Sequence, residues 1–113
     1  MMGGGAPDAF PPEIEKLDAA WAAAGREGEP RRMSLAYFAL GDDARGQARR
    51  YITDYYAFLG DDAAQGFAES VPADADSITG VTEAFAATGC DELVWFPTSS
   101  DPAQVELLGE AVL

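Results

Sequence analysis

The sequence contains no histidine and a single cysteine, Cys90, among its 113 residues. Histidine is the usual side chain for acid–base catalysis near neutral pH and a common zinc ligand, so this chain cannot form histidine-based catalytic or metal sites. A lone cysteine excludes an intrachain disulfide and a cysteine cluster that would hold zinc. We therefore predict no metal site and interpret Cys90 as a small side chain of the core.

Basic residues are also scarce. The chain has 7 lysines and arginines against 20 aspartates and glutamates, which gives a net charge of -13, and Lys16 is the only lysine. Nucleic acids and anionic membranes bind positively charged surfaces, so we expect neither as a partner. The sequence also lacks an apolar run long enough to span a membrane and the basic start of a signal peptide. These absences favour a soluble cytoplasmic protein.

Two short segments are apolar without alternation, which is typical of strands buried on both faces. They are residues 33–40 (MSLAYFAL) and residues 93–96 (LVWF). Elsewhere the apolar residues recur with helical spacing between glycines and prolines. The helices predicted from this spacing cover residues 13–24, 44–59, 63–68, 77–88 and 102–112.

Three of these helices are preceded by acidic or hydroxyl residues that are predicted to cap them. Asp42 and Asp43 precede the helix predicted at 44–59, and either Asp76 or Ser77 caps the one at 77–88. Asp101 caps the last helix and is followed by Pro102 and a capping-box residue, Gln104. Apolar faces are predicted for the same helices and for the first one. These faces are Ile14, Leu17, Trp21 and Ala24; Ala44, Ala48, Tyr51, Ile52, Tyr55 and Leu59; Ile78, Val81, Phe85 and Thr88; and Val105, Leu108 and Val112.

The predicted order is helix, strand, long helical crossover, strand, helix. A buried strand that is followed by a helical crossover and another buried strand predicts a parallel, right-handed unit of the α/β class. Two parallel strands leave two open edges, and the apolar strand at 93–96 needs cover on both faces. The strand is therefore expected to belong to a larger sheet.

Three stretches resemble the C-terminal part of the bacterial luciferase-like monooxygenases, which are flavin- or deazaflavin-dependent oxidoreductases built on a TIM barrel. The stretches are AAWAAAGREGEPRRMSLAYFALGDDA, YITDYYAFLG and FAATGCDELVWFPTSSDPAQVELLGEAV. The resemblance implies that residues 33–40 and 93–96 are the seventh and eighth barrel strands, and that MGGGAP is the loop after the sixth. It also implies that residues 1–113 form a single C-terminal fragment of a (β/α)8 barrel: a partial TIM barrel with about two parallel strands and four or five helices.

In the intact enzyme the resemblance implies one of two reactions. One is oxidation of a small organic substrate with FMN and oxygen, and the other is hydride transfer with the deazaflavin coenzyme F-420. Because the first five strands and most of the sixth are missing, the chain lacks most of the family's active site. It is therefore expected to be inactive alone, to bind neither cofactor tightly, and to need the missing barrel portion as a partner.

The candidate cofactor-binding residues are Gly3, Gly4 and Gly5 in the glycine run and Thr98 and Ser99 after the last strand. Backbone N–H groups of a glycine run can approach a phosphate, and the hydroxyls would lie at the C-terminal mouth of the barrel, where barrel active sites are built. The competing interpretations are a frayed terminus for the glycines and ordinary turn chemistry for the hydroxyls. No catalytic residue is assigned, because in such enzymes the reduced cofactor supplies the chemistry.

Other polar residues near the strand ends are expected to be structural. Asp42 and Asp43 are interpreted as acids that stabilise a helix dipole, and Ser100 as a capping residue. Asp91 and Glu92 precede the last strand and would lie on the stability face of a barrel. The alternative hypothesis for the whole chain is a non-catalytic acidic α/β module that forms homo-oligomers through its open strand edges.

Overall fold

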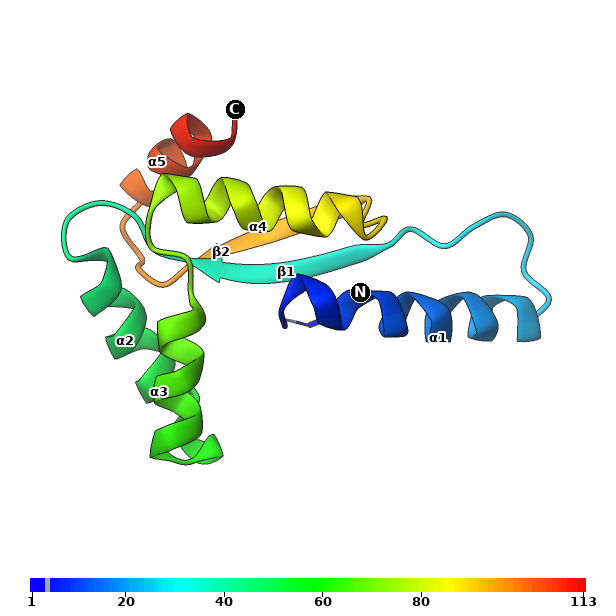
Figure 1. Cartoon of the computed structure of the whole chain (residues 1–113), viewed down its shortest axis with the longest axis horizontal. Coiled ribbons are helices and arrows are strands. Elements are labelled where there is room, and N and C mark those ends of the chain that lie inside the picture. The colour runs from blue at the N-terminus through cyan, green and yellow to red at the C-terminus, as the bar shows by residue number, and fades with distance from the viewer. Residues whose placement is uncertain (4) are drawn as a thin grey trace. The chain divides into compact units, whose positions relative to one another are not determined.

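The computed structural model describes residues 1–3 and 5–113, and Gly4 lies outside the described residues. Helices dominate the described chain, with two strands among them (Figure 1). In chain order the elements are η1 (Pro7–Ala9), α1 (Phe10–Ala23), β1 (Met33–Phe38), α2 (Ala44–Tyr55), η2 (Ala57–Leu59), α3 (Asp61–Ser70), α4 (Ala75–Ala87), β2 (Glu92–Pro97) and α5 (Ala103–Val112). Every predicted helix and strand is present, with bounds that differ by a few residues.

β1 and β2 pair directly and run in the same direction (Figure 1). Backbone hydrogen bonds continue this pairing at both ends: the Asp91 N–H donates to the Arg32 carbonyl (2.8 Å), and the Thr98 N–H donates to the Phe38 carbonyl (3.0 Å). On its other side β1 receives a parallel bridge from Met2. The described residues thus form the predicted α/β fold with a short parallel sheet, and they do not close a barrel.

The chain divides into two compact units, which are described separately. The first unit comprises Met1–Ala36 and Thr82–Val94, and the second comprises Tyr37–Val81 and Trp95–Leu113. Each unit contains part of both strands.

In the first unit, α1 packs through Phe10 against Phe85 of α4. The two buried rings meet edge to face, with centroids 5.8 Å apart. Pro11 and Pro12 stand in the first turn of α1, where a backbone N–H would have no partner in the helix. Phe10, in the first turn, is thus the buried contact of α1. The residues of its predicted apolar face are only half-buried. The half-buried members are Ile14, Leu17 and Trp21.

Asp91 and Glu92 hold the beginning of the sheet in the first unit. The Asp91 carboxylate accepts a hydrogen bond from the backbone N–H of Arg32 (2.8 Å), and Glu92 forms an ion pair with Arg31. These contacts tie the start of β2 to the segment that leads into β1. They give both acids a structural role.

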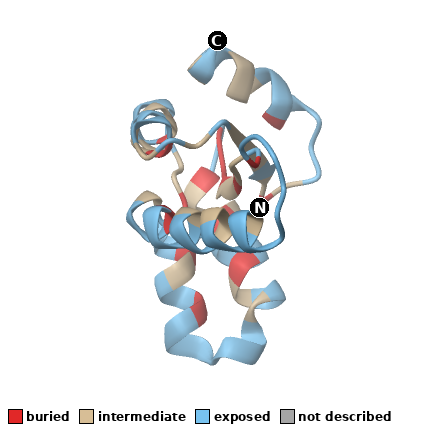
Figure 2. Ribbon diagram, turned by 90° about the vertical axis from the view of Figure 1, so that its right-hand side faces the viewer, coloured by how far each residue is buried: buried red, intermediate tan, exposed pale blue. Residues whose placement is uncertain are grey.

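Two clusters of buried side chains form the core of the second unit. Figure 2 marks the buried positions along the ribbon in red. One lies where α2 meets α3 and contains Ala48, Ile52 and Ala68. The small side chains of the two alanines let the helices approach closely. The other gathers Phe38, at the end of β1, and Ile78 of α4 against apolar residues of α5. Phe38 also meets Trp95 edge to face in this cluster.

The apolar face predicted for α2 is only partly buried. The helix ends at Tyr55, and η2 replaces its predicted last turn, so the helical register is lost before Leu59. α3 covers the alanine side of α2 and leaves the tyrosine side open. The buried members are Ala44, Ala48 and Ile52, and the exposed members are Tyr51, Tyr55 and Leu59.

The predicted helix caps are confirmed only in part. Asp74, rather than Asp76 or Ser77, caps α4: its carboxylate accepts hydrogen bonds from the Ser77 N–H (2.8 Å) and the Ser77 hydroxyl (2.9 Å). These bonds lower the pKa of Asp74. Asp43 does stand at the start of α2, but its backbone is left-handed (φ 55°) and its side chain makes no capping hydrogen bond.

Leu108 packs inward as predicted for α5, but the other two members of the predicted face, Val105 and Val112, are exposed. Gln104 is 3% exposed and hydrogen-bonds both backbone groups of Leu40, whereas Val105 is 68% exposed. The inward position of Gln104 also means that it does not complete a capping box with Asp101. Because residues three and four positions apart share a helix face, the amide sets which apolar residues pack. They are Leu107, Leu108 and Ala111.

Candidate functional site

A pocket of about 510 Å³ lies in the second unit, between the residues that follow β2 and the first turns of α2. It is lined by Gln47, Arg50, Tyr51, Thr98, Ser99 and Ser100. Two of the predicted cofactor-binding residues, Thr98 and Ser99, are therefore together at the carboxyl end of a strand. The backbone of Thr98 is fixed there by its hydrogen bond to Phe38.

Two buried polar atoms of this pocket's lining lack a hydrogen-bond partner in the described protein. They are the hydroxyl oxygen Oγ1 of Thr98, a residue that is 5% exposed, and the amide oxygen Oε1 of Gln47. A buried polar group without a partner costs about 1–3 kcal/mol, and a water or ligand that bonds to it recovers part of this cost. The hydroxyl can donate or accept and the amide oxygen only accepts. The pair therefore suits a ligand that offers both hydroxyl groups and oxygen acceptors.

Gln47 is oriented by the loop that follows β1. Its side-chain nitrogen donates to the Asp42 carbonyl (3.0 Å), and its backbone N–H donates to the Asp43 carbonyl (2.9 Å), which leaves Oε1 unengaged. Asp43 also pairs with Arg50 (3.1 Å), and a Cβ at Gly46 would clash with the Asp43 carboxylate. The two aspartates thus position residues of the pocket, as backbone acceptors and as an ion-pair partner.

Thr98→Val is expected to raise the melting temperature of the protein. Valine has nearly the shape of threonine and removes a buried hydroxyl without a partner, so we expect a gain of about 1 kcal/mol, or about 4 °C. Differential scanning calorimetry measures the shift. Thr53→Val is the matched control, since the Thr53 hydroxyl donates to the Arg49 carbonyl and its loss should bring no gain. A lower melting temperature for Thr98→Val would show that the hydroxyl is bonded in the native protein.

Tyr37 stands at the centre of an aromatic cluster in the second unit. Its hydroxyl lies 3.1 Å from the Tyr56 hydroxyl, and its ring contacts those of Tyr51, Tyr56, Phe67 and Phe96. Burial raises the pKa of Tyr37, and the hydrogen bond with Tyr56 and the neighbouring phenols raise it further. The two hydroxyls therefore serve as hydrogen-bond partners for each other.

We expect Tyr37 to be the last of the four tyrosines to ionise when the protein is titrated with base. A raised pKa means that the native state holds this proton more tightly than the unfolded chain. Its contribution to stability is therefore complete below the unfolded pKa of about 10 and is lost as the pH rises above it. The ultraviolet absorbance of tyrosinate follows the titration. Tyr37→Phe should remove the late step, and a single shared step in the unaltered protein would contradict the assignment.

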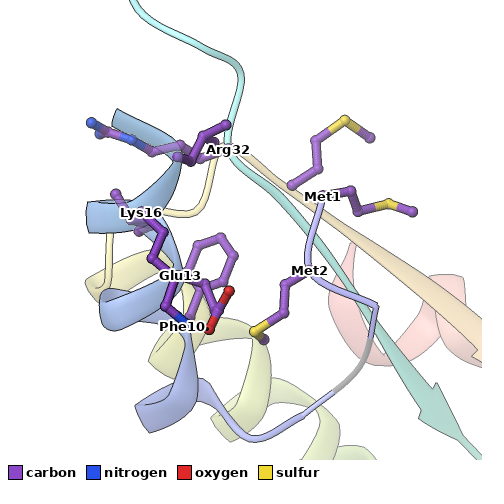
Figure 3. Close-up of a pocket in the computed structure, with 9 residues that line it drawn as sticks. Met1, Met2, Phe10, Glu13, Lys16 and Arg32 are labelled. Carbon is purple, nitrogen blue, oxygen red and sulfur yellow. Dashed lines mark hydrogen bonds and ion pairs between the residues drawn. The ribbon is translucent and has the colours of Figure 1, made fainter. Parts of the chain in front are cut away.

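The first unit contains a more apolar pocket of about 310 Å³, lined by α1, the N-terminal residues and the start of β1 (Figure 3). Met2 extends toward Phe10 and Glu13 of α1. Two charged members of the lining, Glu13 and Lys16, form an ion pair with each other (2.7 Å). A third, Arg32, pairs with Asp18 (3.0 Å). The lining therefore contains one buried polar atom without a partner in the described protein, Nε of Arg32, against two in the pocket beside Thr98.

The predicted glycine run belongs to the first unit. Gly5 has a left-handed φ of 117°, which favours glycine, and a Cβ there would meet the Met2 side chain at 3.5 Å. Gly3 has nothing within 4 Å of such a Cβ, and Gly4 lies outside the described residues. The glycines and the hydroxyls of Thr98 and Ser99 are thus in different units. The role of the run in binding a phosphate stays a prediction.

Other classes of site gain no support from the described residues. In residues 1–3 and 5–113, no group of three or more acidic or cysteine side chains is arranged to hold a metal ion. The thiol of Cys90 lies against backbone carbonyls, 3.2 Å from that of Glu92. None of the helices in this part of the chain is long and apolar enough to cross a membrane.

Gln47 is the pocket residue that sequence reasoning missed. It occupies a polar position within a predicted helix, and such positions normally face solvent. Its only signal is its place one turn after Asp43, in the first turns of a helix that follows a strand. This position points to a binding role only when the structure is known, because only the structure shows that Gln47 shares a pocket with Thr98 and Ser99.

Comparison with known proteins supports the fold. No family model matches the sequence, and no curated protein matches it either. Among solved structures, the chain is similar to an F420-dependent secondary alcohol dehydrogenase in complex with an F420-acetone adduct, with a TM-score of 0.67 and 16% sequence identity. The match covers 97% of this chain and 40% of that enzyme. At this identity the likeness establishes the shared fold, and the chain spans less than half of the enzyme's length.

Proposed function

We propose that this chain is the C-terminal part of a luciferase-like oxidoreductase that transfers a hydride between coenzyme F-420 and a small organic substrate in the cytoplasm. The observation that carries the proposal is the likeness of fold, over 97% of the chain, to an F420-dependent secondary alcohol dehydrogenase. FMN is the alternative cofactor. Alone, the chain is expected to be inactive, because the rest of such a barrel carries most of the active site.

The sheet supports the idea that more strands complete the structure. Met2, β1 and β2 form three neighbouring parallel segments, the arrangement expected for consecutive strands of a barrel. β2 contains no fully buried residue, and Phe96 on it is 42% exposed. A barrel would cover both faces of such an apolar strand. The missing barrel portion is therefore the proposed partner of this sheet.

The pocket beside Thr98 fits one part of either cofactor. F-420 and FMN share a hydroxylated chain that leads to a phosphate, and the pocket offers Oγ1 of Thr98 as a donor and Oε1 of Gln47 as an acceptor. Arg50 also lines the pocket, but its guanidinium pairs with Asp43 (3.1 Å), so a phosphate would share this charge with the aspartate. These residues would hold and orient the chain of the cofactor, with Ser99 beside them. The glycine run belongs to the other unit and is a separate candidate for binding a phosphate. The bound coenzyme itself supplies the hydride chemistry.

The test is cofactor binding by the natural protein, purified from its source cells at whatever length it has there. Titration with F-420 and separately with FMN, followed by fluorescence, distinguishes the two cofactors. We expect F-420 to bind, Thr98→Val to weaken binding about tenfold through loss of one hydrogen bond, and Thr53→Val to leave it unchanged. Binding of FMN alone would replace F-420 in the proposal, and binding of neither would overturn it.

A second candidate function follows from the outer edge of β2, which pairs with no strand in the described part of the chain. An open edge can pair with another chain. In that case the protein would be a non-catalytic acidic module that forms homo-oligomers. Sedimentation equilibrium of the 113-residue chain tests this alternative, since a monomer at all concentrations would exclude it.

A further inference from the structure

The α2–α3 hairpin ends in an exposed stretch of chain (Figure 2). Aromatic and apolar residues stand between aspartates in this stretch. Tyr55 is 61% exposed, Phe58 77% and Leu59 49%. Sequence periodicity predicts Tyr55 and Leu59 to be buried, so their exposure is unexpected. We call this surface the hairpin tip. It consists of Asp54, Tyr55, Phe58, Leu59, Asp61 and Asp62.

The rings of the hairpin tip are held in place by other rings. Tyr55 stacks on Tyr51 with an interplanar angle of 4°, and its edge meets Tyr56 with centroids 5.0 Å apart. Phe58 also packs on Tyr56, which in turn packs on Phe67 of α3 (4.9 Å). The exposed rings therefore form a fixed platform, and little side-chain entropy would be lost when a partner binds it.

The carboxylates of the hairpin tip have no cationic partner. Asp54, Asp61 and Asp62 are exposed and form no ion pair within the described residues. The nearby arginines of α2 are already engaged elsewhere, Arg49 with Glu69 (2.6 Å) and Arg50 with Asp43 (3.1 Å). The platform is thus flanked by carboxylates that no ion pair neutralises, and the whole chain carries a net charge of -13.

We propose that the hairpin tip binds a basic amphipathic segment of another protein. Arginine or lysine side chains of this segment would meet the carboxylates and the face of the Tyr55 ring, which attracts cations. Its apolar side chains would cover Phe58 and Leu59. Charge complementarity selects this partner. A second copy of the chain would bring the same carboxylates together, and nucleic acid or an anionic membrane would be repelled.

The experiment measures binding of a fluorescein-labelled synthetic peptide of repeated Leu-Arg-Arg-Leu units to the full chain by fluorescence anisotropy. Two matched peptides serve as controls, one with glutamate for arginine and one with serine for leucine. The proposal predicts that only the peptide with both arginine and leucine binds well. If the peptide with serine in place of leucine binds equally well, net charge alone accounts for the binding, and the proposal is overturned.

Variants locate the binding surface. Tyr55→Ser with Phe58→Ser, and Asp54→Asn with Asp61→Asn and Asp62→Asn, should each weaken binding at least about tenfold, as expected for central interface residues. The matched control removes the same charge elsewhere and should change binding less than about twofold, as expected for charges away from the contact. It carries Glu83→Gln, Glu106→Gln and Glu110→Gln.

Two outcomes of the variant series contradict the proposal. One is an equal loss of binding in the charge control and in the hairpin-tip variants. The other is a dimer in sedimentation velocity that the tyrosine–phenylalanine variant converts to a monomer, which would make a second copy the occupant. Circular dichroism checks that the variants fold, and Phe58→Ser alone replaces the double variant if the latter melts early.

Discussion

Gln104→Ala is expected to lower the free energy of unfolding by about 3 kcal/mol, because it leaves two buried backbone groups without partners. In the native protein the Gln104 amide oxygen accepts from the Leu40 N–H (3.0 Å), and the amide nitrogen donates to the Leu40 carbonyl (2.7 Å). Leu40 is 7% exposed, so water does not readily replace these bonds. Urea unfolding followed by circular dichroism measures the loss.

Two further variants test this role of Gln104. Val105→Ala changes the neighbouring exposed residue and should alter stability by less than about 0.5 kcal/mol. Gln104→Glu keeps the size of the side chain but sets a carboxylate beside the Leu40 carbonyl, so it should destabilise as strongly as alanine. A loss below about 1 kcal/mol for Gln104→Ala would mean that the Leu40 backbone finds other partners.

Phe38→Ala should cost about 4 kcal/mol of unfolding free energy, the usual loss when a buried phenylalanine is truncated. The Phe38 side chain is 1% exposed and fills the cluster of Leu40, Ile78 and Trp95, with its ring 6.1 Å from that of Trp95. Because domains are stable by only about 5–15 kcal/mol, much of the native population should be lost. Thermal melting and urea titration report the change.

The control for this prediction is the same truncation at an exposed site. Phe58 is 77% exposed, so Phe58→Ala should cost less than about 0.5 kcal/mol. Phe38→Leu keeps most of the buried volume and should fall between the two alanine variants. Similar losses for Phe38→Ala and Phe58→Ala would contradict the assignment of Phe38 to the core.

The class of the fold could be predicted from the sequence because its strongest signals are local. Residues 33–40 are mostly apolar and residues 93–96 are entirely apolar, and both lie between turns; the structure contains β1 and β2 at these places. The face of α5 could not be predicted in the same way. The spacing of apolar residues predicts that Val105 faces the core. In the structure Gln104 faces the core instead, because its side chain hydrogen-bonds the buried backbone of Leu40. A partner 64 residues away in sequence leaves no local pattern.

The candidate site was predicted in part for the same reason. Thr98 and Ser99 follow a strand directly, so their place at its carboxyl end follows from the strand itself. Gln47 belongs to a different element, and its position in the pocket depends on how the loop before α2 folds. The left-handed backbone of Asp43 determines that path, and such a conformation is rare for a residue other than glycine.

The central claim, that this chain belongs to a complete oxidoreductase barrel, is tested most directly by the size of the natural protein. An antibody raised against residues 103–112, the helix α5, would detect the protein in an immunoblot of source-cell lysate. We expect a band that corresponds to a whole barrel of roughly 250 residues or more. A band at the size of the 113-residue chain, 11.9 kDa, would contradict it and would favour the non-catalytic module instead.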